Sequence, residues 1–244
     1  MTAQNLPPVV DRATFQAELD ALRVREKAHT RAGDAIAAAR RRLPMVEVDA
    51  GLTLIGPDGP VTLLDAFEGR RQLIAYYFMW HAGSCAADVC EGCTYYTGQV
   101  RELSTIHSRD ATFAVLCQGP YEESARYREF MGWDMPWYSA RESAAELLAG
   151  RQVGMFHLVC YVRDGDRVFE TYWTNGRGVE AMDNSYGLLD LTVYGRQEPW
   201  EDSPAGWPRD CGTAGPHPYR TNGRPTAQWN RLAAGHSDDL TTAR

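Results

Sequence analysis

The sequence lacks long hydrophobic runs. No window approaches the roughly 20 consecutive apolar residues that a membrane-spanning helix needs. The first residues, MTAQNLPPVVDRATF, also lack the basic cluster and apolar stretch of a secretory signal. The sequence therefore predicts a cytoplasmic protein with no membrane partner.

Positive charge is scarce as well. The chain has 25 lysines and arginines against 32 aspartates and glutamates, which gives a formal net charge of -7. Proteins that bind nucleic acid neutralise phosphates with a basic surface, and this composition offers no such surplus. We therefore expect no nucleic-acid partner.

Internal repeats and low-complexity linkers are missing too, which argues against repeat architectures and long disordered connections. A chain of 244 residues with 44% hydrophobic residues is long enough to bury a core without disulfides. Only six cysteines are present, and their uneven spacing does not suit the disulfide framework of a small secreted domain.

Three of these cysteines and a histidine fall within thirteen positions, HAGSCAADVCEGC, residues 81–93. In a reducing compartment, clustered cysteines indicate redox chemistry or metal binding rather than structural disulfides. The cluster is therefore the first candidate for a functional site.

A β-α-β pattern surrounds the cluster. Residues 72–80 are almost continuously apolar and aromatic, as expected of a central strand covered on both faces. We predict a helix over residues 91–110 and another buried strand over residues 111–119. Such an order implies a parallel pair of strands.

The flanking segments complete an α/β pattern. Residues 11–43 have apolar residues at helical spacing and predict surface helices that end before Pro44. A helix is predicted over residues 121–133. Residues 153–174 predict a β-hairpin, because RDGD places an Asp-Gly turn between two alternating runs.

Cys90 and Cys93 form a Cys-x-x-Cys at the predicted start of a helix. This spacing brings two sulfurs within disulfide reach, and the helix N-terminus stabilises a thiolate. Cys90 is therefore predicted to be the nucleophile and Cys93 the resolving thiol.

The sequence resembles the thioredoxin-like proteins grouped as domain of unknown function 899, described as predicted dithiol-disulfide oxidoreductases. The motifs that carry this resemblance lie between about residues 44 and 208 and include VTLLDAFEGRRQLIAYYFMW, CEGCTYYTGQVRELSTIHSRDATFAVLCQGPYEESARYREFMGWDMPWYSAR, YVRDGDRVFETYWTNGRG and YGLLDLTVYGRQEPWEDSPAGWP. The resemblance implies an α/β, thioredoxin-like fold with N-terminal helices and a C-terminal extension. We expect a helical segment at residues 1–43, the thioredoxin-like domain at 44–208, and a tail at 209–244 that packs on the domain or on a second subunit of a homo-oligomer.

Two features depart from thioredoxins. Thioredoxins have a cis-proline just before the strand beside the dithiol, where it docks the backbone of a protein partner. The matching segment here, RQVGMFHLV, has no proline, which weighs against protein disulfides as substrates. Cys85 is the second departure, because it stands outside the Cys-x-x-Cys.

A metal site is the main alternative. Cys85, Cys90 and Cys93 have the C-x4-C-x2-C spacing that begins one class of [2Fe–2S] site, and His81 could join them around zinc. His157 begins the strand that would run beside the dithiol. Cys90, Cys93 and His157, with Cys85 or His81, would then form a site for copper, zinc or iron, similar in fold and ligand type to Sco-type copper proteins.

Three functions therefore stay open at this point. The first is a thiol-disulfide or peroxide-type oxidoreductase that uses Cys90 and Cys93, requires no cofactor, and has a thiol or disulfide electron donor and a small-molecule substrate. The second is a metal-binding redox enzyme or metal carrier. The third is a thioredoxin-like protein that binds partners without catalysis.

Overall fold

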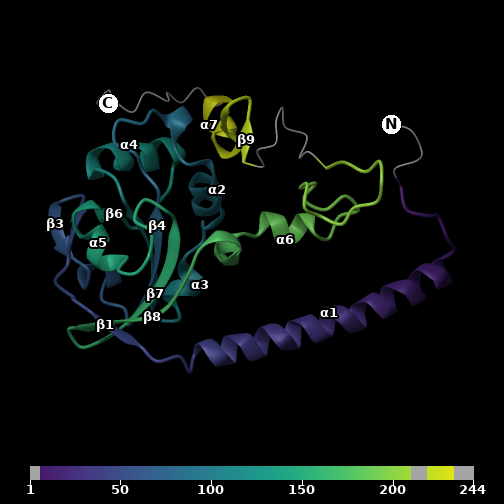
Figure 1. Cartoon of the computed structure of the whole chain (residues 1–244), viewed down its shortest axis with the longest axis horizontal. Helices are drawn as coiled ribbons and strands as arrows, with labels where there is room; N and C mark the ends of the chain where they lie inside the picture. Colours follow the sequence, from purple (N-terminus) through teal and green to yellow (C-terminus); the bar gives the residue numbers. More distant parts are fainter. Residues whose placement is uncertain (1–5, 210–218, 234–244) are drawn as a thin grey trace.

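A computed structural model describes residues 6–209 and 219–233 (Figure 1). The helices of this part are α1 (Arg12–Arg40), α2 (Glu91–Gln99), α3 (Ser104–His107), α4 (Tyr121–Met131), α5 (Ala144–Leu147), α6 (Ser185–Leu189) and α7 (Trp229–Ala233). The strands are β1 (Val46–Val48), β2 (Thr53–Gly56), β3 (Gly59–Thr62), β4 (Gln72–Phe78), β5 (Ala111–Cys117), β6 (Trp137–Ser139), β7 (His157–Asp164), β8 (Arg167–Thr174), β9 (Arg220–Thr221) and β10 (Arg224–Pro225).

Eight strands form one sheet in the order β1-β8-β7-β4-β5-β6-β2-β3. Its centre is β4, which pairs parallel with β5 on one side and antiparallel with β7 on the other. β7 continues into β8 through the two-residue turn predicted from the sequence, with Gly165 at φ 61°. A parallel β-α-β unit followed by an antiparallel hairpin on the other side of its first strand is the thioredoxin-like arrangement, so the predicted fold is confirmed.

β4 separates two hydrophobic cores. Successive side chains of a strand point to opposite faces of the sheet, and five of the seven residues of β4 are buried. Tyr76 and Phe78 belong to the first cluster, which α2 and α4 cover. Leu73, Ala75 and Tyr77 belong to the second cluster, on the other face.

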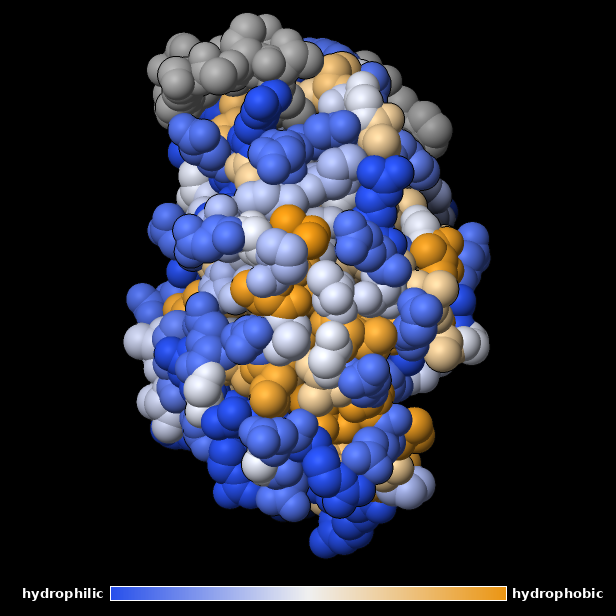
Figure 2. Space-filling model, turned by 90° about the vertical axis from the view of Figure 1, so that its left-hand side faces the viewer, coloured by the Kyte–Doolittle hydropathy of each residue, from blue (hydrophilic) through white to orange (hydrophobic). Residues whose placement is uncertain are grey.

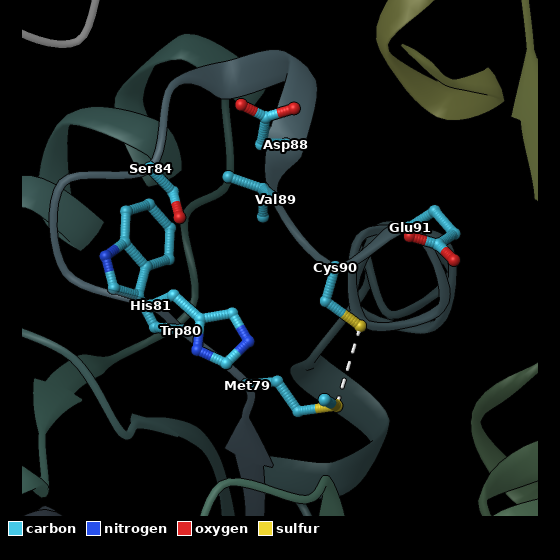
Figure 3. Close-up of a pocket in the computed structure, with 8 residues that line it drawn as sticks. All are labelled: Met79, Trp80, His81, Ser84, Asp88, Val89, Cys90 and Glu91. Atoms are coloured by element: carbon cyan, nitrogen blue, oxygen red, sulfur yellow. Dashed lines mark hydrogen bonds between the residues drawn. The ribbon is translucent and has the colours of Figure 1, made fainter. Parts of the chain in front are cut away.

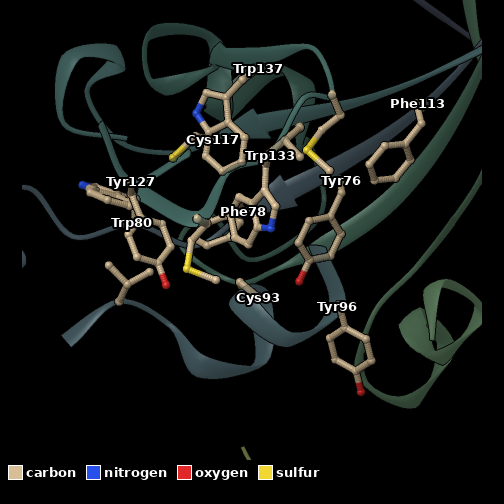
Figure 4. Close-up of a cluster of buried hydrophobic side chains, with 14 of the residues drawn as sticks. Tyr76, Phe78, Trp80, Cys93, Tyr96, Phe113, Cys117, Tyr127, Trp133 and Trp137 are labelled. Carbon is tan, nitrogen blue, oxygen red and sulfur yellow. The ribbon is translucent and has the colours of Figure 1, made fainter. Parts of the chain in front are cut away.

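The first cluster is unusually aromatic around Phe78 (Figure 4). The rings of Trp80, Trp133 and Trp137 have their centroids within 6.3 Å of the Phe78 ring. Such rings bury large apolar areas and hold one another in fixed orientations. The face of the sheet beneath α2 is therefore filled by closely packed aromatic rings.

The single helix predicted over residues 91–110 is wrong in one respect. The structure ends α2 at Gln99 and starts α3 at Ser104, because Val100 is extended, with φ -92° and ψ 94°. Val100 and Leu103 both pack against the first cluster. Burying these two apolar side chains turns the chain out of the helix, which helical periodicity alone does not predict.

α1 is a free-standing helix. Asp11 caps its N-terminus by accepting a hydrogen bond from the Thr14 backbone N–H at 2.8 Å, and none of its 29 residues is buried. Figure 1 shows it running away from the sheet. Among the described helices, none is long and apolar enough to cross a membrane.

Hydrophobic and polar side chains occupy different parts of one surface of the sheet domain. Figure 2 shows hydrophobic side chains gathered in the middle and lower-middle of the face at the left of Figure 1, with mainly polar residues above and below them. β1 lies at that level in Figure 1, and its first residue, Val46, is 67% exposed. β1 is one edge strand of the sheet, and β3, at the left of Figure 1, is the other.

Candidate functional site

The two cysteines of Cys-x-x-Cys lie at the N-terminus of α2, directly above the end of β4. Cys90 is the N-cap residue, and its sulfur accepts a hydrogen bond from the Cys93 backbone N–H at 3.3 Å. Cys93 is fully buried, and its sulfur accepts from the Met79 backbone N–H at 3.4 Å. Cys90 is therefore the half-buried, outer thiol and Cys93 the inner one.

Their surroundings shift the two pKa values in opposite directions. The pKa of Cys90 is lowered, first by the hydrogen bond from the Cys93 side chain and also by the backbone N–H groups of Cys93 and Gly92, while burial and Glu91 oppose this effect. Burial raises the pKa of Cys93 well above its usual range, and the hydrogen bond to Cys90 raises it further. The arrangement favours a thiolate on Cys90 and a thiol on Cys93.

A pocket opens beside Cys90 (Figure 3). Its volume is about 220 Å³, and Met79, Trp80, His81 and Cys90 are among the residues that line it. The Cys90 sulfur lies 3.7 Å from the Met79 sulfur, so one wall of the pocket consists of two sulfur atoms. Cys93 is not part of the lining, which leaves Cys90 as the thiol that a ligand in the pocket would meet.

The loop between β4 and α2 is fixed by α4. One carboxylate oxygen of Glu123 accepts hydrogen bonds from the Trp80 indole at 3.0 Å and from the Gly83 backbone N–H at 2.9 Å. Trp80 also packs tightly against Gly119, where a Cβ atom would stand 2.1 Å from the Trp80 ring. Glu123 and Gly119 therefore hold Trp80, which lines the pocket.

A second brace comes from β9, far along the chain. Arg220 donates to a Glu91 carboxylate oxygen at 3.0 Å, to the Ala87 carbonyl at 2.9 Å and to the Gly223 carbonyl at 2.7 Å. Nearby, the buried Gln228 donates to the Ala86 carbonyl at 2.6 Å. Sequence reasoning missed this brace, since a lone arginine in a polar tail gives no local signal.

The structure places Cys85 and His81 on the loop between β4 and α2, outside the Cys-x-x-Cys. Cys85 is exposed, and its thiol donates to the Asp88 carboxylate at 3.1 Å. His81 is exposed and lines the pocket beside Trp80. Within residues 6–209 and 219–233, no three His, Cys, Asp or Glu side chains converge in a geometry suited to a metal ion.

The expectation that His157 lies beside the dithiol is wrong. His157 stands opposite Tyr77 in the β4–β7 register, and directly paired residues point to the same face of a sheet. That face carries the second cluster, whereas Cys93 lies in the first. The His157 ring instead packs edge-on against Trp173, and its Nε2 lies 3.0 Å from the Gln152 carbonyl oxygen.

The strand order and the dithiol at the start of α2 together define a thioredoxin-like protein. More particularly, the chain belongs to the family described as "Bacterial protein of unknown function (DUF899)", whose model matches residues 4–213. A comparison with curated proteins gave no match. Among solved structures, the chain is similar to peroxidoxin BcpB from Mycobacterium tuberculosis, at 18% identity and a TM-score of 0.41, over 57% of this chain and 90% of that one.

Proposed function

We propose that this protein is a dithiol oxidoreductase that reduces small disulfides. The observation that carries the proposal is the position of Cys90, whose sulfur caps α2 and lines the pocket while Cys93 lies buried behind it. The lowered pKa of Cys90 supports its role as the attacking thiolate. The raised pKa of Cys93 keeps the resolving group protonated until the second step.

The reaction proceeds by two thiol-disulfide exchanges. The Cys90 thiolate attacks one sulfur of the substrate disulfide, which forms a mixed disulfide and releases the other half as a thiolate. Cys93 then loses its proton to solvent or to the departing thiolate, and its sulfur attacks Cys90 to release the second half. The substrate gains two electrons, and the Cys90–Cys93 pair, which loses two, is reduced again by an external thiol.

The size of the pocket favours a small substrate. About 220 Å³ accommodates one half of a low-molecular-weight disulfide rather than a folded partner. The segment before β7, residues 151–156, contains no proline on which a protein partner could dock as on thioredoxins, and Phe156 in it packs against the first cluster. The proposal assigns the protein to the cytoplasm, where low-molecular-weight thiols supply the electrons.

A peroxide would use the same two thiols. Cys90 would attack the peroxide oxygen to give a sulfenic acid and an alcohol or water, and Cys93 would displace water to form the same disulfide. The two substrate classes can therefore be compared in one assay, with dithiothreitol as the external thiol. The oxidant is either bis(2-hydroxyethyl) disulfide or hydrogen peroxide.

The test is the rate of dithiothreitol oxidation by the full chain and its variants. We expect Cys90→Ser to abolish turnover and Cys93→Ser to accumulate a mixed disulfide with the disulfide substrate, visible by mass spectrometry. Cys85→Ser, which removes an exposed thiol outside the pair, is the matched control and should retain turnover. Full activity of Cys90→Ser with both oxidants would refute the proposal.

A further inference from the structure

A second pocket lies at the other end of α2, away from the dithiol. Its volume is about 260 Å³, and it is lined by residues from the end of α2, the end of α4 and the segment that contains α7. α2 rises about 1.5 Å per residue, so its last turn stands more than about 10 Å from Cys90 along the helix axis. The dithiol chemistry does not use this pocket.

The lining is positively charged in a chain that is acidic overall. It contains Arg101 and Arg231 and no acidic residue. Both guanidinium groups converge on Gly132, because Arg101 donates to the Gly132 carbonyl at 2.8 Å and Arg231 stands 3.2 Å from where a Gly132 Cβ would lie. Among the ion pairs of the described part of the chain, neither arginine has a carboxylate partner.

Buried hydrogen-bond donors also lack partners here. Trp133 is 3% exposed, and its indole N–H makes no hydrogen bond within residues 6–209 and 219–233. The Nε of Arg231 is likewise buried without an acceptor in this part of the chain. Leaving such groups unpaired costs free energy, which an acceptor bound in the pocket would recover.

The rest of the wall is mixed: Gln99, Thr226 and Asn230 contribute polar groups, and the remaining side chains contribute apolar and aromatic surface. Tyr95, Met131 and Ala227 line the pocket next to the Trp133 ring, which is held in place by stacking on Trp137 with centroids 5.7 Å apart. A cavity of roughly 150 Å³ already holds a benzene-sized molecule. The space therefore suits a compact ring or short chain that carries one anionic group.

We propose that this pocket binds a small organic carboxylate, with Arg101 and Arg231 on the carboxylate and Trp133 donating its indole N–H. Planar guanidinium groups match carboxylate geometry, and the Tyr95, Met131 and Ala227 side chains offer an organic anion apolar contacts that a bare inorganic anion does not use. The carboxylate would join α2 and the end of α4 to α7.

The test is a titration of the full-length protein with benzoate, followed by Trp fluorescence and by isothermal calorimetry. We expect saturable, one-to-one binding. Arg101→Gln and Arg231→Gln should each weaken it about tenfold or more, since each removes a charged hydrogen bond. Trp133→Phe keeps the ring and removes the N–H, so it should weaken binding by a smaller factor.

Three controls make the outcome decisive. Benzamide has the shape of benzoate without its charge and should not bind, and Arg109→Gln changes an exposed arginine outside the pocket and should leave the affinity unchanged. Cys90→Ser should bind benzoate like the unmodified protein, so the result does not depend on the proposed oxidoreductase activity. The inference is overturned if benzoate does not bind, if inorganic phosphate binds as tightly, or if affinity is the same in both arginine variants.

Discussion

Cys90 and Cys93 are three positions apart in the sequence, and yet they differ in exposure, hydrogen bonding and acidity. The inner thiol donates to the outer one, and this contact is the largest cause of the lowered pKa of Cys90. The same contact raises the pKa of Cys93, which burial has already raised. At the scale of single residues, the two thiols are therefore not equivalent. In the hydrogen bond between them, Cys93 is the donor and Cys90 is the acceptor.

A pH titration of Cys90 tests this division. The rate of alkylation should follow the thiolate fraction, so it should fall tenfold per pH unit below the pKa of Cys90 and level off above it. The midpoint should lie below the ordinary thiol value of 9.0. Cys93→Ala removes the hydrogen bond from the inner thiol and should move the midpoint up by about one pKa unit.

The measurement is the rate of iodoacetamide labelling of the Cys90 peptide, followed by mass spectrometry from pH 5 to pH 10. Cys85→Ala removes a thiol that contacts Asp88 rather than the dithiol, and it should leave the Cys90 midpoint unchanged. An unchanged midpoint in Cys93→Ala would mean that the helix N-terminus alone sets the acidity of Cys90.

At the scale of elements, the start of α2 is held by the β9–β10 segment. Arg220 forms an ion pair with Glu91, whose negative charge raises the pKa of Cys90. The Arg220–Glu91 pair is mostly buried, with 24% and 21% of the two side chains exposed. The loop that leads into α2 thus depends on a residue 129 positions away from Glu91 in the chain.

Arg220→Gln tests the importance of this brace. We expect a loss of about 1–2 kcal/mol in the free energy of unfolding, because a partly buried ion pair and its backbone acceptors lose their partner. The pKa of Cys90 should rise, since Glu91 is no longer paired with Arg220. Urea unfolding and the Cys90 labelling profile measure the two effects.

The matched control is Arg167→Gln, which breaks an ion pair with Glu47 whose side chains are 61% and 54% exposed. Exposed pairs contribute little, so both measurements should stay close to those of the unmodified protein. If Arg220→Gln behaves like this control, the β9–β10 segment does not brace the site.

Some of these elements can be predicted from the sequence, and others cannot. β4, the start of α2, β5 and the β7–β8 hairpin follow from local patterns, and Cys90 and Cys93 follow from their spacing at a helix start. The position of His157 depends on the register of β7 against β4, and one residue of shift exchanges the two faces of the sheet. Glu123 and Arg220 act through contacts over 40 and 129 positions, which no local pattern in one sequence contains.

At the scale of the whole molecule, α1 and the C-terminal segment contribute differently to the packing of the sheet domain. The C-terminal segment has a buried glutamine, Gln228, that hydrogen-bonds both the loop before α2 and Tyr127 of α4. α1 buries no residue, and the cation–π contact of Arg40 with Tyr172, at 5.1 Å, lies at its very end. A long helix without a buried face gains little from tertiary packing.

Deletion of residues 1–41 should therefore leave the sheet domain intact. The expected change in Tm is no more than about 2–4 °C, which corresponds to about 1 kcal/mol in a domain of this size. Cys90 labelling should stay the same, and far-UV circular dichroism should lose the signal of one long helix. A chain that ends at residue 209 is the comparison, and it should unfold at a clearly lower temperature because it lacks Arg220 and Gln228. A large loss of stability in the first variant would show that α1 packs against a surface, within the chain or on another copy, that supports the fold.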